Sequence, residues 1–326
     1  MARFGQHSMP LSSSRGLPDA VDAPAATKCP SCAGSDLRRI GQLPVVSVFA
    51  GQDAGGTLPA SSLFGCRACG LLFRYPVLSR SQYDALYGKV QPTTWPDQPG
   101  RIDWALIVEY VGRNSAAGAS ILDFGCHTGG LLRRLGSRYS LYGVEVNETA
   151  AQIAREKTGA EIVEGLEALP RGKQFDFVTA VDVVEHFSDP GRVIACLLEA
   201  VKPGGMLIVT TGDADAWLWR IAGSRWWYCY YTEHLAFVSE GWMRDWLKRD
   251  AIRAHVAEAH RFRHLHLSPL RYVRQACLFA AYLASPRAYT WAMRHLKRIL
   301  RRQGDVDPPG TGLTKDHVFL AIRKQP

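Results

Sequence analysis

The chain has 326 residues, 47% of them hydrophobic, which is enough for one large α/β domain and a small second domain. No stretch approaches the roughly 18 consecutive apolar positions of a membrane-spanning helix, which argues against such a span. The net charge of +9 is uneven, because residues 261–303 carry ten Arg and Lys and no acid.

The first 26 residues are rich in Ser, Pro, Gly and Ala and lack the apolar core of a signal peptide. A segment of this composition buries too little apolar surface to fold alone, so we expect a disordered leader over residues 1–26. Without a secretion signal, the chain is expected to be cytoplasmic.

Four cysteines form two Cys-x-x-Cys pairs, Cys29 with Cys32 and Cys66 with Cys69, separated by 33 residues. A tetrahedral Zn²⁺ binds four thiolates, and a two-residue gap lets a tight turn direct both sulfurs of a pair at one ion. Two disulfides or a redox-active pair are the alternatives. A reducing cytoplasm disfavours the disulfides, and no thioredoxin-like βαβ pattern surrounds either pair.

Short strands are predicted at Leu43–Ala50 and Leu63–Phe64, on either side of a turn at Gly55-Gly56, and this arrangement is similar to a zinc ribbon. The sequence therefore predicts a structural zinc module over residues 27–75, followed by a linker over residues 76–100. Because so short a segment has little core of its own, the metal is expected to fold it.

From residue 101 onward, strand and helix patterns alternate, which predicts an α/β domain over residues 101–326 with a mainly parallel sheet. Apolar runs predict the strands, and amphipathic runs predict the helices between them. The predicted strands are Ser120–Phe124, Leu141–Val146, Glu161–Val163, Phe175–Val181 and Met206–Thr211, and helices are expected from Leu131, Glu148 and Val193.

A glycine-rich loop, Gly125 to Gly129, follows the first of these strands. A dinucleotide site needs glycine at the middle position so that the backbone can approach a pyrophosphate, but this chain has His127 there. S-adenosylmethionine has no pyrophosphate, and its sites typically carry an acid two residues before the first glycine, where this chain has Asp123. Glu145 ends the second strand, where a carboxylate can accept hydrogen bonds from ribose hydroxyls. These features favour S-adenosylmethionine.

The motif set from Ile121 to Thr211 resembles the class I S-adenosylmethionine-dependent methyltransferases, over roughly residues 101 to 260. Asp182-Val-Val-Glu-His186 is similar to the branch that methylates small molecules and sugars. The resemblance implies a Rossmann-like, seven-stranded sheet. It also implies cofactor contacts, which are Asp123, Gly125, His127 and Gly129 at the methionine end, Glu145 at the ribose, Leu166 near the adenine, and Asp182 and Val183 beside the sulfonium. His127 departs from the family's usual glycine, although histidine tolerates positive φ better than most residues.

Methyl transfer requires an acceptor aligned with the methyl group and often the removal of one proton. The acceptor is expected beyond the carboxyl ends of the fourth and fifth strands. His186 follows the fourth strand, and Tyr231, Glu233 and His234 follow the fifth.

Between the fifth strand and His234 the chain has an aromatic stretch, Trp217–Tyr231, which we interpret as a pocket wall in preference to core filler. Glu233-His234 after such a stretch resembles the sugar C-methyltransferases, which also carry an amino-terminal zinc module. The resemblance implies His234 as the general base, with Glu233, His186 and Tyr231 as further catalytic candidates.

The last part of the chain is expected to complete the sheet around a basic insertion. A helix is predicted at Glu240–Lys248, and strands at Ala254–Ala259 and Asp316–Arg323, the last one antiparallel. Between these strands, residues 261–303 are expected to form one or two amphipathic helices that lie at an anionic membrane, such as the inner membrane surface, where a lipid-linked glycan would be found.

The sequence thus predicts a methyltransferase that uses S-adenosylmethionine and a structural Zn²⁺, with a sugar, nucleotide-sugar, glycan or other small molecule as acceptor. An RNA methyltransferase is the rival, since zinc modules and positive charge also suit RNA. Nucleic acid is not the favoured partner, because the basic residues cluster late and the aromatic stretch is poor in lysine. A non-catalytic module that binds the cofactor or a partner is the other alternative.

Overall fold

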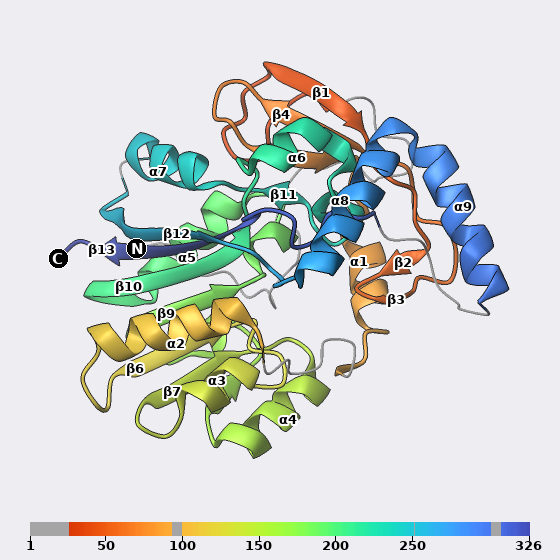
Figure 1. The fold of residues 1–326 in the computed structure, drawn as a ribbon. Coiled ribbons are helices and arrows are strands. Elements are labelled where there is room, and N and C mark those ends of the chain that lie inside the picture. The colour runs from red at the N-terminus through yellow and green to blue at the C-terminus, as the bar shows by residue number, and fades with distance from the viewer. Residues whose placement is uncertain (1–25, 93–99, 251, 301–307) are drawn as a thin grey trace.

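The computed structural model describes residues 26–92, 100–250, 252–300 and 308–326, so the predicted leader lies almost wholly outside the described residues. A seven-stranded sheet forms the centre of the molecule, with helices on both faces (Figure 1). In spatial order its strands are β12 (Ala254–Phe262), β13 (His317–Lys324), β10 (Val201–Gly212), β9 (Phe175–Val181), β6 (Ser120–Phe124), β7 (Ser140–Val144) and β8 (Glu161–Val163). Neighbours from β10 to β8 are parallel, and β13 is antiparallel to both β10 and β12. This confirms the predicted α/β fold and its antiparallel last strand.

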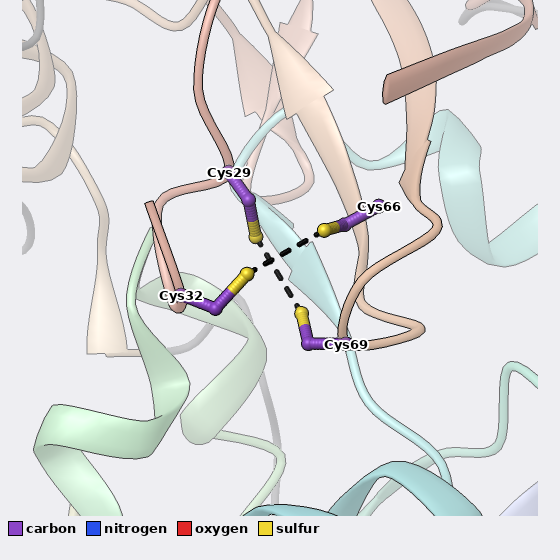
Figure 2. Close-up of side chains that lie close together, drawn as sticks. All are labelled: Cys29, Cys32, Cys66 and Cys69. Atoms are coloured by element: carbon purple, nitrogen blue, oxygen red, sulfur yellow. Dashed lines mark hydrogen bonds between the residues drawn. The ribbon is translucent and has the colours of Figure 1, made fainter. Parts of the chain in front are cut away.

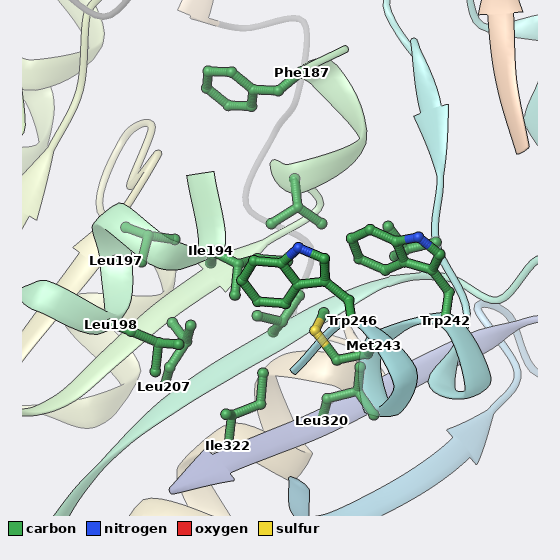
Figure 3. Close-up of a cluster of buried hydrophobic side chains, with 14 of the residues drawn as sticks. Phe187, Ile194, Leu197, Leu198, Leu207, Trp242, Met243, Trp246, Leu320 and Ile322 are labelled. Atoms are coloured by element: carbon green, nitrogen blue, oxygen red, sulfur yellow. The ribbon is translucent and has the colours of Figure 1, made fainter. Parts of the chain in front are cut away.

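Alternate side chains of each strand point to opposite faces of the sheet, as the two-residue period of a strand requires. On β10, Leu207 and Val209 pack in a cluster with residues of α5 and α7, whereas Met206 and Ile208 pack with residues of α2 and α3. Figure 3 shows the first of these clusters, with Trp242 and Trp246 of α7 beside Ile194 of α5. The helices concerned are α2 (Ile102–Asn114), α3 (Gly130–Leu135), α4 (Glu148–Thr158), α5 (Pro190–Glu199) and α7 (Glu240–Arg249).

The amino-terminal residues form a second, antiparallel sheet in the order β1-β4-β5-β11. Its strands are β1 (Leu37–Gln42), β4 (Ser62–Cys66), β5 (Leu72–Tyr75) and β11 (Ala236–Phe237), and a small hairpin of β2 (Val48–Phe49) and β3 (Gln52–Asp53) lies beside it. The strand predicted at Leu43–Ala50 is thus reduced to β2. Because β11 belongs to the segment directly after His234, the two parts of the chain share a sheet.

Residues 76–100, where a linker was predicted, include helix α1 (Arg80–Tyr87). Ser79 and Gln82 form a capping box, in which each side chain accepts a hydrogen bond from the other's backbone N–H. Tyr87 packs edge-on against Phe49, with ring centroids 4.8 Å apart. The described part of this segment, residues 76–92, is therefore packed structure, and it carries Tyr87 towards the large domain.

Two helices, α8 (Pro269–Ala284) and α9 (Pro286–Ile299), lie between β12 and β13 in the chain, within the segment 261–303 where a basic insertion was predicted. Ser285 caps α9 by accepting a hydrogen bond from the backbone N–H of Ala288. Among the described residues, no helix combines the length and the apolar character that a bilayer crossing requires.

Candidate active site

The glycine loop after β6 has three residues in the left-handed backbone conformation. Gly125, His127 and Gly129 have φ angles of 79°, 47° and 76°. A Cβ at Gly125 would lie 2.7 Å from Cγ2 of Val183, and one at Gly129 would lie 3.2 Å from Cα of Ala154. Glycine is therefore required at both positions. His127 adopts the left-handed conformation in place of the usual glycine, as its tolerance of positive φ allows.

Glu145 is fixed beside this loop by two backbone hydrogen bonds. Its Oε2 accepts from the N–H of His127 and its Oε1 from the N–H of Asn147, both at 2.8 Å. Burial raises the pKa of Glu145, and the two N–H donors partly offset this rise. The carboxylate thus lies at the tip of β7 with its remaining lone pairs available to hydroxyl groups.

Asp123 is buried near the end of β6, and its Oδ1 accepts a hydrogen bond from the hydroxyl of Thr179 at 2.7 Å. Burial raises the pKa of Asp123 to about 6, although the Thr179 hydroxyl lowers it in part. Leu166 follows β8 and is half-buried. Because β6, β7 and β8 are parallel neighbours, Asp123, Glu145 and Leu166 lie at the same edge of the sheet.

Glu145→Gln is expected to weaken S-adenosylmethionine binding about 10- to 100-fold, since a hydrogen bond to a charged group contributes about 1.5–3 kcal/mol. The amide would also present N–H groups to the backbone donors of His127 and Asn147. Isothermal calorimetry measures the change. Glu148→Gln is the matched control, because that side chain is 77% exposed and pairs only with Arg155 among the described residues. An unchanged Kd for Glu145→Gln would remove this residue from the cofactor site.

Asp182 follows β9 in a left-handed conformation, with a φ of 51°. Its Oδ2 accepts a hydrogen bond from Nη2 of Arg101 at 2.6 Å, while its Oδ1 is buried and has no hydrogen-bond partner among the described residues. Burial alone would raise the pKa of Asp182, but Arg101 lowers it below its ordinary value. Arg101, which the sequence analysis missed, therefore keeps this carboxylate charged.

His186 and His234, predicted from separate segments, lie side by side with ring centroids 5.2 Å apart. Nδ1 of His234 is 3.1 Å from the carbonyl oxygen of Tyr228, so Nδ1 carries the proton and Nε2 carries the lone pair. Nδ1 of His186 is 2.9 Å from the hydroxyl of Tyr87. Burial lowers the pKa of His186 to about 4 and that of His234 well below its ordinary value, so both rings are neutral at physiological pH.

Glu185 lies against the same pair of histidines. One potential ligand atom from each of Glu185, His186 and His234 falls within 4.8 Å of the others, which is close enough to share one cation. Oε1 of Glu185 accepts a short hydrogen bond from the Tyr228 hydroxyl, while Oε2 is buried without a partner among the described residues. Burial, and then the charge of Asp182, raise the pKa of Glu185 to about 7.

A His–Asp pair that the sequence analysis did not identify lies at the start of β13. His317 pairs with Gly212 at the end of β10, which places it at the carboxyl edge of the parallel strands. Its Nδ1 is 3.1 Å from Oδ1 of Asp316, and Nε1 of Trp227 donates to Oδ2 of Asp316 at 2.9 Å. Burial lowers the pKa of His317, but the hydrogen bond and charge of Asp316 raise it by more. The only sequence signal was the adjacent Asp-His pair, which reads as the start of an ordinary strand.

The aromatic stretch is mostly core, which corrects its interpretation as a pocket wall. Trp219, Trp226 and Trp227 are at most 5% exposed and belong to one buried cluster with Phe237 and Phe279. The cluster joins residues of α6 (Trp217–Ala222), of β4 and β11 in the small sheet, and of α8. Tyr231 differs from these residues. It is 37% exposed, and its ring centroid is 5.2 Å from that of His234, so it lies at the rim of the histidine pair.

Glu233 does not contact its neighbour His234 through its side chain. It is buried, and its Oε2 has no hydrogen-bond partner among the described residues. Burial raises its pKa, while backbone N–H groups and Arg74 lower it in part. The structure therefore gives Glu233 no direct link to the histidine pair.

Arg74 of β5, a further residue that the sequence analysis missed, holds the segment that carries His234. The guanidinium is buried and donates through Nε to the carbonyl of His234 at 3.0 Å. Its Nη2 donates to the carbonyls of Cys229 and Tyr231, each at 2.8 Å, and its Nη1 to the hydroxyl of Ser61 at 2.7 Å. One side chain of the amino-terminal part thus binds three carbonyls of residues 229–234, which we call the acceptor segment.

The four paired cysteines converge on one point, as Figure 2 shows. Their sulfur atoms all lie within 4.8 Å of one another, with Cys29 and Cys69 3.6 Å apart and Cys32 and Cys66 3.5 Å apart. Four thiolates at about 2.3 Å from a tetrahedral Zn²⁺ are roughly 3.8 Å apart. The cluster therefore fits one zinc ion with four sulfur ligands.

Comparison with known proteins agrees with an α/β methyltransferase fold over residues 101–250. Residues 101–250 match the family described as "Methyltransferase domain". The chain is 33% identical over 139 residues to the ubiquinone biosynthesis O-methyltransferase of Pseudomonas fluorescens, covering 39% of this chain and 57% of that protein. It is 30% identical over 138 residues to the protein of the same name from Acinetobacter baylyi, covering 39% and 56%. The chain thus spans little more than half the length of these relatives.

Among solved structures, a putative methyltransferase from Bacillus halodurans aligns with a TM-score of 0.47 and 15% identity, over 69% of this chain and 99% of that one. The family match covers the segment that carries Asp123, the glycine loop, Glu145 and Asp182. The chain therefore contains a class I, S-adenosylmethionine-dependent methyltransferase domain.

Proposed function

We propose that the protein transfers a methyl group from S-adenosylmethionine to a hydroxyl oxygen of a small-molecule acceptor. One observation carries the proposal. Asp182 Oδ1, Glu185 Oε2 and His317 Nε2 are buried at the carboxyl edge of β9 and β10 without hydrogen-bond partners among the described residues. Buried polar atoms are nearly always paired, so such a set suits a polar ligand. The name O-methyltransferase carried by the relatives supports oxygen as the receiving atom.

S-adenosylmethionine, when bound, supplies an electrophilic methyl group on a positively charged sulfur. The chain's own residues would hold it as the sequence predicts, with Glu145 at the ribose, Leu166 at the adenine, and the 125–129 loop with Asp123 at the methionine end. Asp182, with Val183 beside it, would lie near the sulfonium, where a charged carboxylate is favourable.

We assign the proton transfer to His234. Its Nδ1–H donates to the Tyr228 carbonyl, so Nε2 is available to take the proton of the acceptor hydroxyl. Because its pKa is lowered by burial and by His186, the ring is in the accepting form throughout the physiological pH range. His186 and Tyr231 would line the acceptor, while Glu233 would support the segment from within.

His317 is a second candidate for the base, favoured by its pairing with Asp316. A carboxylate on Nδ1 fixes the tautomer with Nε2 free and makes the ring more basic, which suits proton abstraction. Two variants separate the candidates. If His234 is the base, His234→Gln lowers kcat by about 10²- to 10⁴-fold with the Kd for S-adenosylmethionine unchanged, while His317→Gln has a smaller effect. The reverse pattern assigns the base to His317, and full activity in both variants removes the histidine mechanism.

Two acceptor classes suit the site. The rings of Tyr231, His186 and His234 favour a flat aromatic hydroxyl compound, and the sequence resemblance also favours a sugar, nucleotide-sugar or glycan. Mass spectrometry with labelled S-adenosylmethionine, a panel of phenols and catechols, and a panel of nucleotide-sugars decides between them. An RNA methyltransferase would instead label RNA with a steep salt dependence. A non-catalytic module would bind the cofactor without turnover on any panel.

We further propose that Cys29, Cys32, Cys66 and Cys69 hold a structural Zn²⁺. All four positions are thiolates, so a tetrahedral ion would have no open position for catalysis. Free thiols persist in reducing compartments, which supports the proposal of a cytoplasmic location.

A further inference from the structure

Helix α8 exposes an apolar stripe along its whole length. Leu270 and Val273 are 82% and 59% exposed. Further apolar residues follow them on the same side of the helix, at intervals of three or four residues. The stripe consists of Leu270, Val273, Cys277, Ala280, Ala281 and Ala284, all of them exposed. Soluble helices usually turn such a stripe towards the core, so this one is available to something outside the domain.

The side of α8 opposite the stripe packs firmly against the rest of the protein. Phe279 is buried edge-on against Trp226, with ring centroids 5.5 Å apart. Tyr282 packs against Tyr289 of α9 at 5.3 Å. The α8–α9 hairpin (residues 269–299) is therefore anchored to the domain while it presents the stripe outward.

Helix α9 adds large apolar side chains to the exposed surface. Trp291 is 71% exposed, Ile299 65% and Leu296 45%, and Leu300, directly after the helix, is 55% exposed. Tryptophan is the residue most suited to the boundary between water and lipid. Scattered exposed apolar residues are ordinary, but their concentration on one hairpin marks an interaction surface.

The charge of the hairpin is of one sign only. Residues 269–299 contain six basic residues and no Asp or Glu. The basic residues are Arg271, Arg274, Arg287, Arg294, Lys297 and Arg298, of which all but the half-buried Lys297 are exposed. The partner must therefore be both apolar and anionic. A second copy of this hairpin would bring like charges together, and a nucleic acid would leave the apolar stripe in contact with water.

We propose that the α8–α9 hairpin docks the protein on the surface of an anionic lipid bilayer. The stripe of α8 enters the boundary between headgroups and acyl chains, and the flanking Arg and Lys side chains contact phosphate groups. The helices lie on the membrane and do not cross it. This surface would hold the catalytic domain beside acceptors that are dissolved in or tethered to the bilayer.

Flotation of the full chain with vesicles tests the proposal. We expect binding to vesicles of phosphatidylglycerol and phosphatidylcholine, little binding to phosphatidylcholine alone, and release when NaCl rises from 0.1 M to 1 M, because the Debye length falls from about 10 Å to 3 Å. Leu270→Ser with Val273→Ser is expected to weaken the partition coefficient at least about tenfold, since two exposed apolar side chains are lost at constant charge. Arg274→Gln with Arg294→Gln is expected to weaken it several-fold.

The matched control is Val45→Ser with Ile221→Ser, two apolar residues that are 45% and 64% exposed elsewhere on the molecule. This control should bind vesicles as the unaltered chain does, and all variants should keep their unfolding temperature and their Kd for S-adenosylmethionine. Absence of binding to the anionic vesicles overturns the proposal, as does binding that the Leu270 and Val273 replacements leave unchanged. A dimer in light scattering that those replacements convert to a monomer would assign the stripe to a second copy instead.

Discussion

Removal of zinc from the four-cysteine cluster is expected to abolish methyl transfer while the cofactor loop continues to bind S-adenosylmethionine. Structural zinc in small modules contributes about 10–16 kcal/mol of apparent free energy, which matches or exceeds the 5–15 kcal/mol net stability of a whole domain. The amino-terminal sheet should therefore unfold without the metal. Because β11 pairs with β5 in that sheet, the acceptor segment before β11 should lose its support.

The separation of the two effects follows from the fold. Asp123, Glu145 and Leu166 lie at the ends of β6, β7 and β8, none of which pairs with the small sheet. Replacing Cys32 and Cys69 by Ser should therefore leave the Kd for S-adenosylmethionine within a few-fold of its starting value. Hydrogen exchange should accelerate in residues 229–237 and in the amino-terminal sheet, and elemental analysis should change from one zinc per chain to none.

Cys277→Ser provides the control, because Cys277 is an exposed free thiol on α8. It should retain zinc, activity and hydrogen-exchange protection. Metal-free protein with unchanged activity and unchanged protection at residues 229–237 would contradict both the zinc assignment and the support that the module gives to the acceptor segment.

The large sheet could be predicted from the sequence because its signals are local. The parallel strands are short and mainly apolar, as buried parallel strands require, and helices separate most of them. The glycine loop could also be located from the sequence, because its signals are local. Gly125 and Gly129 allow the positive φ angles of the turn, and Asp123 lies two residues before Gly125. Even the boundaries of β8 and β9 agree with the prediction.

The acceptor side could be predicted only in part, because its contacts join residues that are far apart in the chain. His186 and His234 were both candidates, but their edge-on contact depends on how two loops meet. Arg74 lies in an apolar strand and contacts carbonyls more than 150 positions later, so no pattern within β5 reveals its role. His317 reads as the first residue of a strand, and only the register with β10 places it at the carboxyl edge. The aromatic stretch was wrongly interpreted as a pocket wall, because large rings are equally common in cores and in pockets.

Arg74→Met is expected to lower the free energy of unfolding by about 3–5 kcal/mol. Removing one partner from a buried charged network typically costs this much. The three carbonyls of Cys229, Tyr231 and His234 would remain buried without their donor, and each such loss costs about 1–3 kcal/mol. For a large domain, each kcal/mol of lost stability lowers the unfolding temperature by about 2–4 °C. Differential scanning calorimetry of the zinc-loaded protein measures the shift. Arg67→Met, in the same module, removes an exposed ion pair with Asp36 and should change the unfolding temperature little.

The kinetic effect distinguishes a positioning residue from a merely structural one. Without Arg74 the backbone at His234 is free to shift, and a displacement of about 1 Å at a catalytic group can cost roughly 10²-fold in rate. We therefore expect kcat to fall about 100-fold at temperatures far below unfolding, with the Kd for S-adenosylmethionine unchanged. Arg74→Lys should restore the charge but little of the rate, because an ammonium group cannot serve three carbonyls with the planar fork of a guanidinium. A loss of stability with kcat intact would mean that Arg74 holds the two sheets together without setting the position of His234.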